Sequence, residues 1–321
     1  MTGAPRQAQR GFTLVELMVS LVIFSFAIAG IMAVAVTMTR AYREQRRAIA
    51  TENAARAPMD FIADAVRSAS PGVTTGNVHD AYTCAAGAVA HLDNTGAPDE
   101  LEIVYASGGI VTTTHSAFTS SSAAITVPAD HVDQFAAGDY VLVTDSAQGT
   151  VAKVTGITGN NLDLAPITCA TAFPTGGYPS GSILVRAQRA RFTIDNLDGV
   201  PTLFMDPDGL AGPAEAEPVA EGVEDFQVAI GVDADASGDL LDNGGADEWA
   251  GNAPGDVLPA GAIRAVKVVL VARDTKEISG GSATFFRPAA LNRSAATELD
   301  KYRRRVLTST IEIRNLAGSP E

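Results

Sequence analysis

The sequence predicts an α+β protein, in which a long N-terminal transmembrane and amphipathic helix packs on an antiparallel β-sheet head with an inserted β subdomain. An apolar run long enough to span a membrane follows residue 16, and a helical pattern of apolar residues continues beyond it. After residue 70 the pattern changes to short alternating runs separated by glycine, asparagine, aspartate and threonine, which is typical of strands and turns.

The N-terminus combines a short basic leader with an apolar helix. No charged residue occurs from Leu17 to Met38, and about 20 apolar residues are enough to span a bilayer as a helix. Glu16 lies at the start of this run, and a carboxylate inside a bilayer costs on the order of 2.5–3.5 kcal/mol on insertion scales. We therefore expect Glu16 to be kept for a partner and not for stability.

The helical pattern continues past the apolar run. Between residues 41 and 68, Ala55, Met59, Ile62 and Val66 recur at spacings of three and four, which predicts one apolar face. Pro58 is expected to kink the helix or to end a segment of it.

The remaining chain is predicted to be rich in strands. Residues 116–172 resemble a self-contained set of strands and form the expected subdomain. The predicted strands are Leu101–Ala106, Ala124–Val127, Asp139–Thr144, Val151–Ile157, Ser182–Ile194, Thr202–Met205, Val223–Val232, Ile263–Ala272 and Val306–Asn315.

Composition disfavours several classes of function. The formal net charge is -14, and an acidic surface repels phosphate backbones, so no nucleic-acid partner is expected. Aromatic residues make up only 6% of the chain, which argues against a surface that stacks sugars or bases. The four histidines are scattered without metal spacing, and the sequence contains no nucleophile elbow, P-loop or dinucleotide fingerprint, so an enzyme is not expected.

Two cysteines occur, Cys84 and Cys169, each in a loop-like context. An even pair in an extracytoplasmic domain indicates a disulfide, which would clamp the base of the inserted subdomain. Closing so long a loop stabilises a fold by about 4–5 kcal/mol in the chain-entropy model. The alternative is two unpaired buried thiols.

An acidic stretch after the strand at 223–232 resembles the first half of a calcium loop. Oxygen-bearing residues alternate in it and a glycine occupies the sixth position, but the twelfth position is glycine and the flanks are strands, so it is not an EF-hand. The alternative is a solvated hairpin. The candidate Ca²⁺ ligands are Asp233, Asp235, Ser237, Asp239, Asp242 and Glu248.

The residues Gly11-Phe12-Thr13-Leu14-Val15-Glu16 resemble the class III signal of type IV pilins and type II secretion pseudopilins. The resemblance implies that a prepilin peptidase cuts after Gly11 and that the new terminal Phe12 is N-methylated. It also implies that Glu16 pairs with the terminal amine of a neighbouring subunit during filament assembly. The expected partners are this peptidase, other minor and major pilins, and the inner membrane.

The same resemblance implies a topology and a set of domains. The leader at 1–11 would be cytoplasmic, although four arginines after the apolar run favour the opposite orientation by the positive-inside rule. The transmembrane helix would occupy 12–39, the periplasmic half of the long helix 40–70 and the β-rich head 71–321. The protein would move from the inner membrane to a periplasmic or extracellular pilus.

Three C-terminal segments are similar to the late strands of PilW/PulJ-type minor pilins, namely 223–228, 265–273 and 311–316. The implied function is a minor pilin involved in assembly or initiation of a type IV pilus, with a position near its tip. A type II secretion minor pseudopilin of the PulJ type and a pilus-tip adhesin are the alternatives. In the adhesin, residues 116–172 would form the binding surface.

Overall fold

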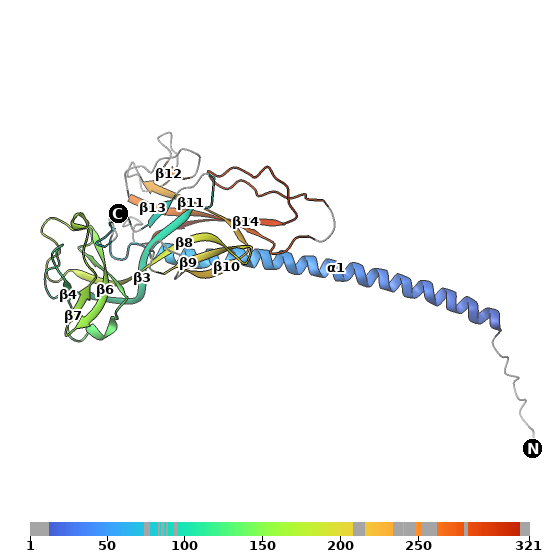
Figure 1. The fold of residues 1–321 in the computed structure, drawn as a ribbon, viewed down its shortest axis with the longest axis horizontal. Coiled ribbons are helices and arrows are strands. Elements are labelled where there is room, and N and C mark those ends of the chain that lie inside the picture. The colour runs from blue at the N-terminus through green and yellow to red at the C-terminus, as the bar shows by residue number, and fades with distance from the viewer. Residues whose placement is uncertain are drawn as a thin grey trace, which may run out of the picture. The chain divides into compact units, whose positions relative to one another are not determined.

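The computed structural model is an α+β protein with one long helix and two β-sheets (Figure 1). It describes residues 13–73, 78–82, 84, 87, 89–92, 96–207, 216–233, 240, 248–251, 262–278 and 282–314. The chain forms two compact units: the first ends at Ala50 and the second begins at Thr51.

Helix α1 runs from Leu14 to Arg67. In the first unit its large apolar side chains from Leu14 to Met38 are exposed, and no other helix among the described residues is long and apolar enough to cross a membrane. The Ser20, Ser25 and Thr37 hydroxyls donate to main-chain carbonyls four residues earlier, at 2.7–2.9 Å. Polar groups of this segment are therefore satisfied within the helix, as an apolar environment requires.

The part of α1 in the second unit contributes an apolar face to the core. Met59, Ile62 and Val66 are at most 5% exposed and pack among residues of both sheets. The helix continues through Pro58, so the prediction that a segment ends there is wrong. Proline removes one main-chain hydrogen bond, but apolar packing immediately after it holds the following turns in place.

The larger sheet has the strand order β10-β9-β8-β5-β6-β7-β4, with β3 on β8, β2 on β3 and β1 on β6. All of its pairs are antiparallel except that of β1 with β6. The strands are β1 (Val78–Asp80), β2 (Val89–Leu92), β3 (Glu100–Thr113), β4 (Ala124–Thr126), β5 (Tyr140–Thr144), β6 (Gly149–Thr158), β7 (Asn161–Leu164), β8 (Ile183–Leu197), β9 (Val200–Asp206) and β10 (Glu217–Glu221).

The smaller sheet is antiparallel, with the order β12-β11-β13-β14. Alternate residues of β11 point into the main core, beside the end of α1 and the inner face of the larger sheet, and they include Phe226, Val228 and Ile230. Each of the nine predicted strands overlaps a strand of the structure, although β3 runs to Thr113, well beyond its predicted end at Ala106. The strands of this sheet are β11 (Val223–Asp233), β12 (Trp249–Ala250), β13 (Ala262–Arg273) and β14 (Arg304–Glu312).

A second apolar cluster lies in the region of the expected insertion. It joins β4, β5, β6 and β7 and includes Phe118, whose ring centroid lies 5.2 Å from that of Phe173. Tyr178 and Leu184 belong to the same cluster, so this core extends beyond residue 172. Burial raises the pKa of Tyr178 to about 12, and its hydroxyl lies 3.0 Å from that of Thr150. Two short 3₁₀ helices, η1 (Val132–Gln134) and η2 (Ala170–Ala172), complete the region.

Candidate functional site

The first candidate site is the beginning of α1. The Glu16 carboxylate accepts hydrogen bonds from the Thr13 main-chain N–H and hydroxyl, both at 3.0 Å, and the Thr13 hydroxyl accepts from the Glu16 N–H at 3.3 Å. This reciprocal pattern is a capping box, and the Thr-x-x-Glu spacing could have revealed it in the sequence. Glu16 therefore lies in the first turn, beside the predicted processing site. Gly11 and Phe12 lie outside the described residues.

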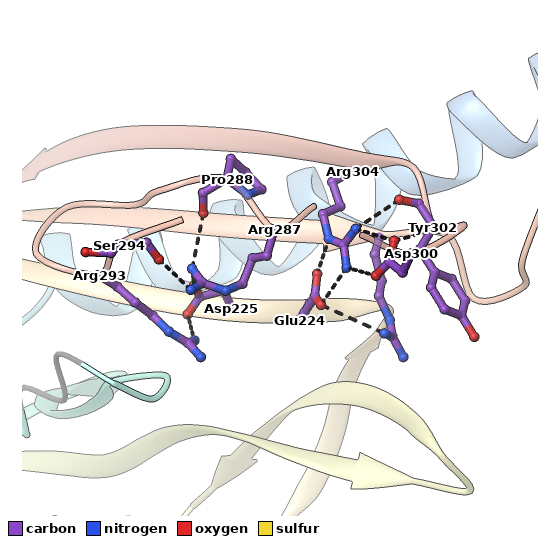
Figure 2. Close-up of polar contacts among 10 residues, drawn as sticks. Glu224, Asp225, Arg287, Pro288, Arg293, Ser294, Asp300, Tyr302 and Arg304 are labelled. Atoms are coloured by element: carbon purple, nitrogen blue, oxygen red, sulfur yellow. Dashed lines mark hydrogen bonds and ion pairs between the residues drawn. The ribbon is translucent and has the colours of Figure 1, made fainter. Parts of the chain in front are cut away.

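A second feature is a buried ion cluster on the outer face of the smaller sheet (Figure 2). Asp225 of β11 is fully buried, and its two carboxylate oxygens lie 2.9 Å from Nη1 of Arg287 and 2.6 Å from Nη1 of Arg293. The Gln227 amide donates to the same carboxylate at 3.0 Å. Both arginines come from the long connection between β13 and β14, so the cluster holds that connection against β11.

A second cluster holds the far end of the same connection (Figure 2). Arg304, at the start of β14, donates to the Glu224 carboxylate from Nε and Nη2 at 2.5 and 2.9 Å and also pairs with Asp300. Hydrogen bonding to Arg304 lowers the pKa of the Asp300 carboxyl. The Arg273 guanidinium stacks 4.3 Å from the centre of the Tyr302 ring. In both clusters the arginines bind carboxylates of the chain itself, an arrangement that fixes a loop.

The larger sheet has its own buried cation. Arg189 of β8 is 2% exposed and pairs with Asp80 at the end of β1 and with Glu102 of β3. Its guanidinium also lies 6.0 Å from the centre of the Tyr140 ring. Arg189 thus joins three strands, and its ion pairs compensate charges that would otherwise be desolvated alone. The sequence reasoning did not identify this residue or the clusters around Asp225 and Glu224, because each pairs residues far apart in the chain.

The two cysteines are brought together. Cys84 is exposed, Cys169 is partly exposed, and both are free thiols in the structure. Cys169 precedes η2 and the side chains of the two residues hydrogen-bond to each other. The predicted alternative of two buried thiols is therefore wrong for Cys84. The disulfide itself stays a prediction.

The predicted calcium loop is described only at its base. Val232 donates from its N–H to the main-chain oxygen of Glu248 at 2.8 Å, so Asp233 and Glu248 begin and end the connection from β11 to β12. Asp233 is 4% exposed and pairs with Arg264 at 3.2 Å. Among the described residues there is no group of three or more potential metal ligands. The calcium site stays a prediction, and the candidates that lie outside the described residues are Asp235, Ser237, Asp239 and Asp242.

Calcium is expected to raise the melting temperature of the full-length chain in detergent, relative to EDTA. A ligand that binds only the folded state stabilises it by about 2.7 kcal/mol at a hundredfold excess over its dissociation constant. The double variant Asp235→Ala/Asp239→Ala should lose the shift, whereas Glu221→Gln, which changes an exposed carboxylate on β10, should keep it. Identical melting curves of the unmodified chain in calcium and EDTA would contradict a calcium site and favour the alternative, in which the acidic stretch is a solvated hairpin.

Comparison with known proteins gives two family matches and several similar solved chains. Residues 191–315 match the family described as Type IV Pilus-assembly protein W, and residues 6–32 match the prokaryotic N-terminal methylation motif. No curated protein matches the chain. A type IV-like pilin, TTHA1219 from Thermus thermophilus, aligns at 17% identity with a TM-score of 0.26, over 58% of this chain and 87% of that one.

Some of the features described above lie inside the two matched regions and others lie outside them. The motif covers Thr13 and Glu16, and the longer match runs from within β8 to the end of β14. Asp225 and Glu224, with the arginines that bind them, lie inside the longer match. The second apolar core and both cysteines lie outside both matches.

Proposed function

We propose that this chain, a type IV pilin-like minor pilin of the PilW type, helps to initiate the assembly of a type IV pilus and is incorporated near its tip. The observation that carries the proposal is the methylation motif at 6–32, in which Glu16 lies in the first turn of a helix with an exposed apolar surface. Such a helix requires a membrane before assembly and other apolar helices afterwards. The proposal assigns no catalytic step to the chain.

The partners follow from the chemistry of this first turn. A prepilin peptidase would cut before Phe12 and free its main-chain amine. This amine would carry a positive charge both before and after methylation. The Glu16 carboxylate, which in the single chain is held by Thr13, would pair with the terminal amine of a neighbouring pilin. Pairing would remove two charges from the apolar filament interior together, which is less costly than burying either one alone.

Protein isolated from the native host is expected to begin at methylated Phe12. Intact-mass and N-terminal analysis would detect the missing leader and the added methyl group. Gly11→Val should retain the leader, because a branched side chain would replace the small residue before the cut, whereas Gly3→Ala should be processed normally. A chain that begins at Met1, or one cut beyond the apolar segment, would contradict the proposal.

Glu16→Ala is expected to insert into the membrane normally but to enter filaments at least tenfold less efficiently. Loss of the carboxylate leaves the neighbouring amine buried without a counter-charge, and a tenfold change corresponds to only about 1.4 kcal/mol. Quantitative immunoblots of sheared pili and membrane fractions would measure the ratio. Glu52→Ala is the matched control, because Glu52 is an exposed carboxylate on the same helix that pairs only with Arg56 in the described structure at 2.7 Å. Normal incorporation of Glu16→Ala would count against this role.

Adhesion at the pilus tip is a second candidate function. It is favoured by the second apolar core, which supports a β-rich region outside the family match. A type II secretion role is less favoured, because the matched family is described by pilus assembly. Deletion of the gene would separate them: loss of pili supports the first proposal, loss of adhesion with normal pili supports the second, and loss of protein secretion supports the pseudopilin.

A further inference from the structure

The segments that carry Cys84 and Cys169 are joined by main-chain hydrogen bonds. The carbonyl oxygen of Ala81 accepts from the N–H groups of Thr168 and Cys169, at 3.0 and 3.1 Å. The Thr168 hydroxyl donates to the carbonyl of Tyr82 at 2.6 Å. These bonds place the two thiols beside each other without help from a covalent link.

Cys84 and Tyr82 are also held by hydrogen bonds to Asp80, at the end of β1. The Cys84 N–H donates to the carbonyl of Asp80 at 3.1 Å, and the carboxylate of Asp80 accepts from the N–H of Tyr82 at 2.6 Å. The same carboxylate pairs with buried Arg189. Cys84 has a φ of +62°, a conformation that non-glycine residues seldom adopt. The turn that presents this thiol is therefore fixed by several independent contacts.

The two thiols differ in acidity. The Cys84 thiol donates to the Cys169 sulfur, which lowers the pKa of Cys169 and raises the pKa of Cys84. The Thr171 hydroxyl, 3.2 Å from the Cys169 sulfur, lowers the pKa of Cys169 further. A thiolate attacks disulfides and a thiol does not, so the two residues are suited to different steps of an exchange reaction.

We propose that Cys84 and Cys169 form a thiol pair that is closed by exchange with an external disulfide, in which Cys169 attacks first. The Cys169 thiolate attacks one sulfur of the oxidant, forms a mixed disulfide and releases the first oxidant thiolate. Cys84 then loses its proton and attacks the Cys169 sulfur as a thiolate, the second oxidant thiolate departs and takes up a proton, and the internal disulfide is complete. The protein loses two electrons and the oxidant gains them.

Closure would link two parts of the larger sheet region. Cys84 follows β1, whereas Cys169 precedes η2, and Phe173 directly after η2 packs on Phe118 in the second core. The bond would therefore fix the edge of that core to the end of β1. The oxidising surroundings that close it in the cell rest on the extracytoplasmic location in the proposed function, but the reactivity of the pair does not.

The test uses the full-length chain in detergent, reduced and then exposed to oxidised glutathione. The unmodified chain is expected to lose two hydrogen atoms by intact mass and to accumulate no stable glutathione adduct. Cys84→Ser retains a hydroxyl that can donate to Cys169, so its thiol should form the mixed disulfide at pH 7 at least threefold faster than the thiol of Cys169→Ser. At a pH above both thiol pKa values the advantage of Cys84→Ser should disappear, because both thiols are then ionised and the thiolate of higher pKa is the stronger nucleophile.

Two results would overturn the proposal. One is a stable glutathione adduct on the unmodified chain with no internal closure, which would show that the thiols cannot reach each other. The other is faster adduct formation by Cys169→Ser than by Cys84→Ser at neutral pH, which would reverse the order of attack. Neither result depends on filament assembly, so failure here is distinguishable from failure of the proposed function.

Discussion

Asp225→Asn is expected to lower the free energy of unfolding by about 3–5 kcal/mol, the usual cost of removing one partner from a buried ion pair. The substitution keeps the shape of the side chain but removes the only charge between two guanidinium groups. Arg287 and Arg293 are 11% and 15% exposed at the side chain, so water cannot replace the lost carboxylate fully. The connection between β13 and β14 would then lose the attachment to β11 that Arg287 and Arg293 provide.

Two measurements separate this effect from a general loss of structure. Trp249, the single tryptophan, lies in β12 beside β11, so its fluorescence during denaturation of the full-length chain reports on the smaller sheet. Limited trypsin digestion at the arginines of the β13–β14 connection should become faster before the sheet unfolds. Asp64→Asn is the control, because Asp64 pairs with Arg67 on the surface at 3.2 Å and should change stability by less than about 1 kcal/mol. Equal stability of the two variants would contradict the role of Asp225 in holding the β13–β14 connection to β11.

Arg189→Met is expected to cost a similar amount, about 3–5 kcal/mol, in the larger sheet. Methionine fills much of the same volume but leaves Asp80, at 4% exposure, without its counter-charge. Arg186→Met on the same strand is the control, since Arg186 is 33% exposed and pairs with Asp139 at 3.0 Å. That variant should lose no more than about 1 kcal/mol.

A second variant tests the reason for the loss. The triple substitution Asp80→Asn/Glu102→Gln/Arg189→Met removes all the charges together, and replacing a whole buried cluster is often close to neutral. It should therefore recover much of the stability lost by Arg189→Met alone, as measured by thermal unfolding of the full-length chain in detergent. If the triple variant is less stable than Arg189→Met, packing and not charge explains the role of Arg189.

The long helix and the longer strands could be predicted from the sequence, because the pattern of apolar residues that indicates each of them lies within the element itself. Alternation over Val266, Val268 and Leu270 predicted β13, and the spacing of Met59, Ile62 and Val66 predicted the buried face of α1. By contrast, β1 has three residues and β12 has two, which is too short to show a period, and neither was predicted. Tertiary packing also overrode a local signal at Pro58, where the helix continues.

Among the candidate sites, too, those formed by neighbouring residues could be predicted, and those formed by distant residues could not. Glu16 stood out because a charge in an apolar run is conspicuous, and its Thr13 cap has a recognisable spacing. By contrast, Asp225 looks like any other strand aspartate, and its partners Arg287 and Arg293 lie more than sixty residues away in a loop without periodicity. Only the fold shows that these three residues meet. The same holds for the contact between Cys84 and Cys169.

Strand β8 sets an order of events during synthesis of the chain. It pairs with β3, β5 and β9, so it lies between strands made before it and a strand made after it. Until residues 183–197 are available for pairing, β3 and β5 each lack a neighbour and present open main-chain edges. Such edges are templates for association with other chains, and pairings distant in sequence form slowly. The first half of the head therefore keeps these open edges until its central strand arrives.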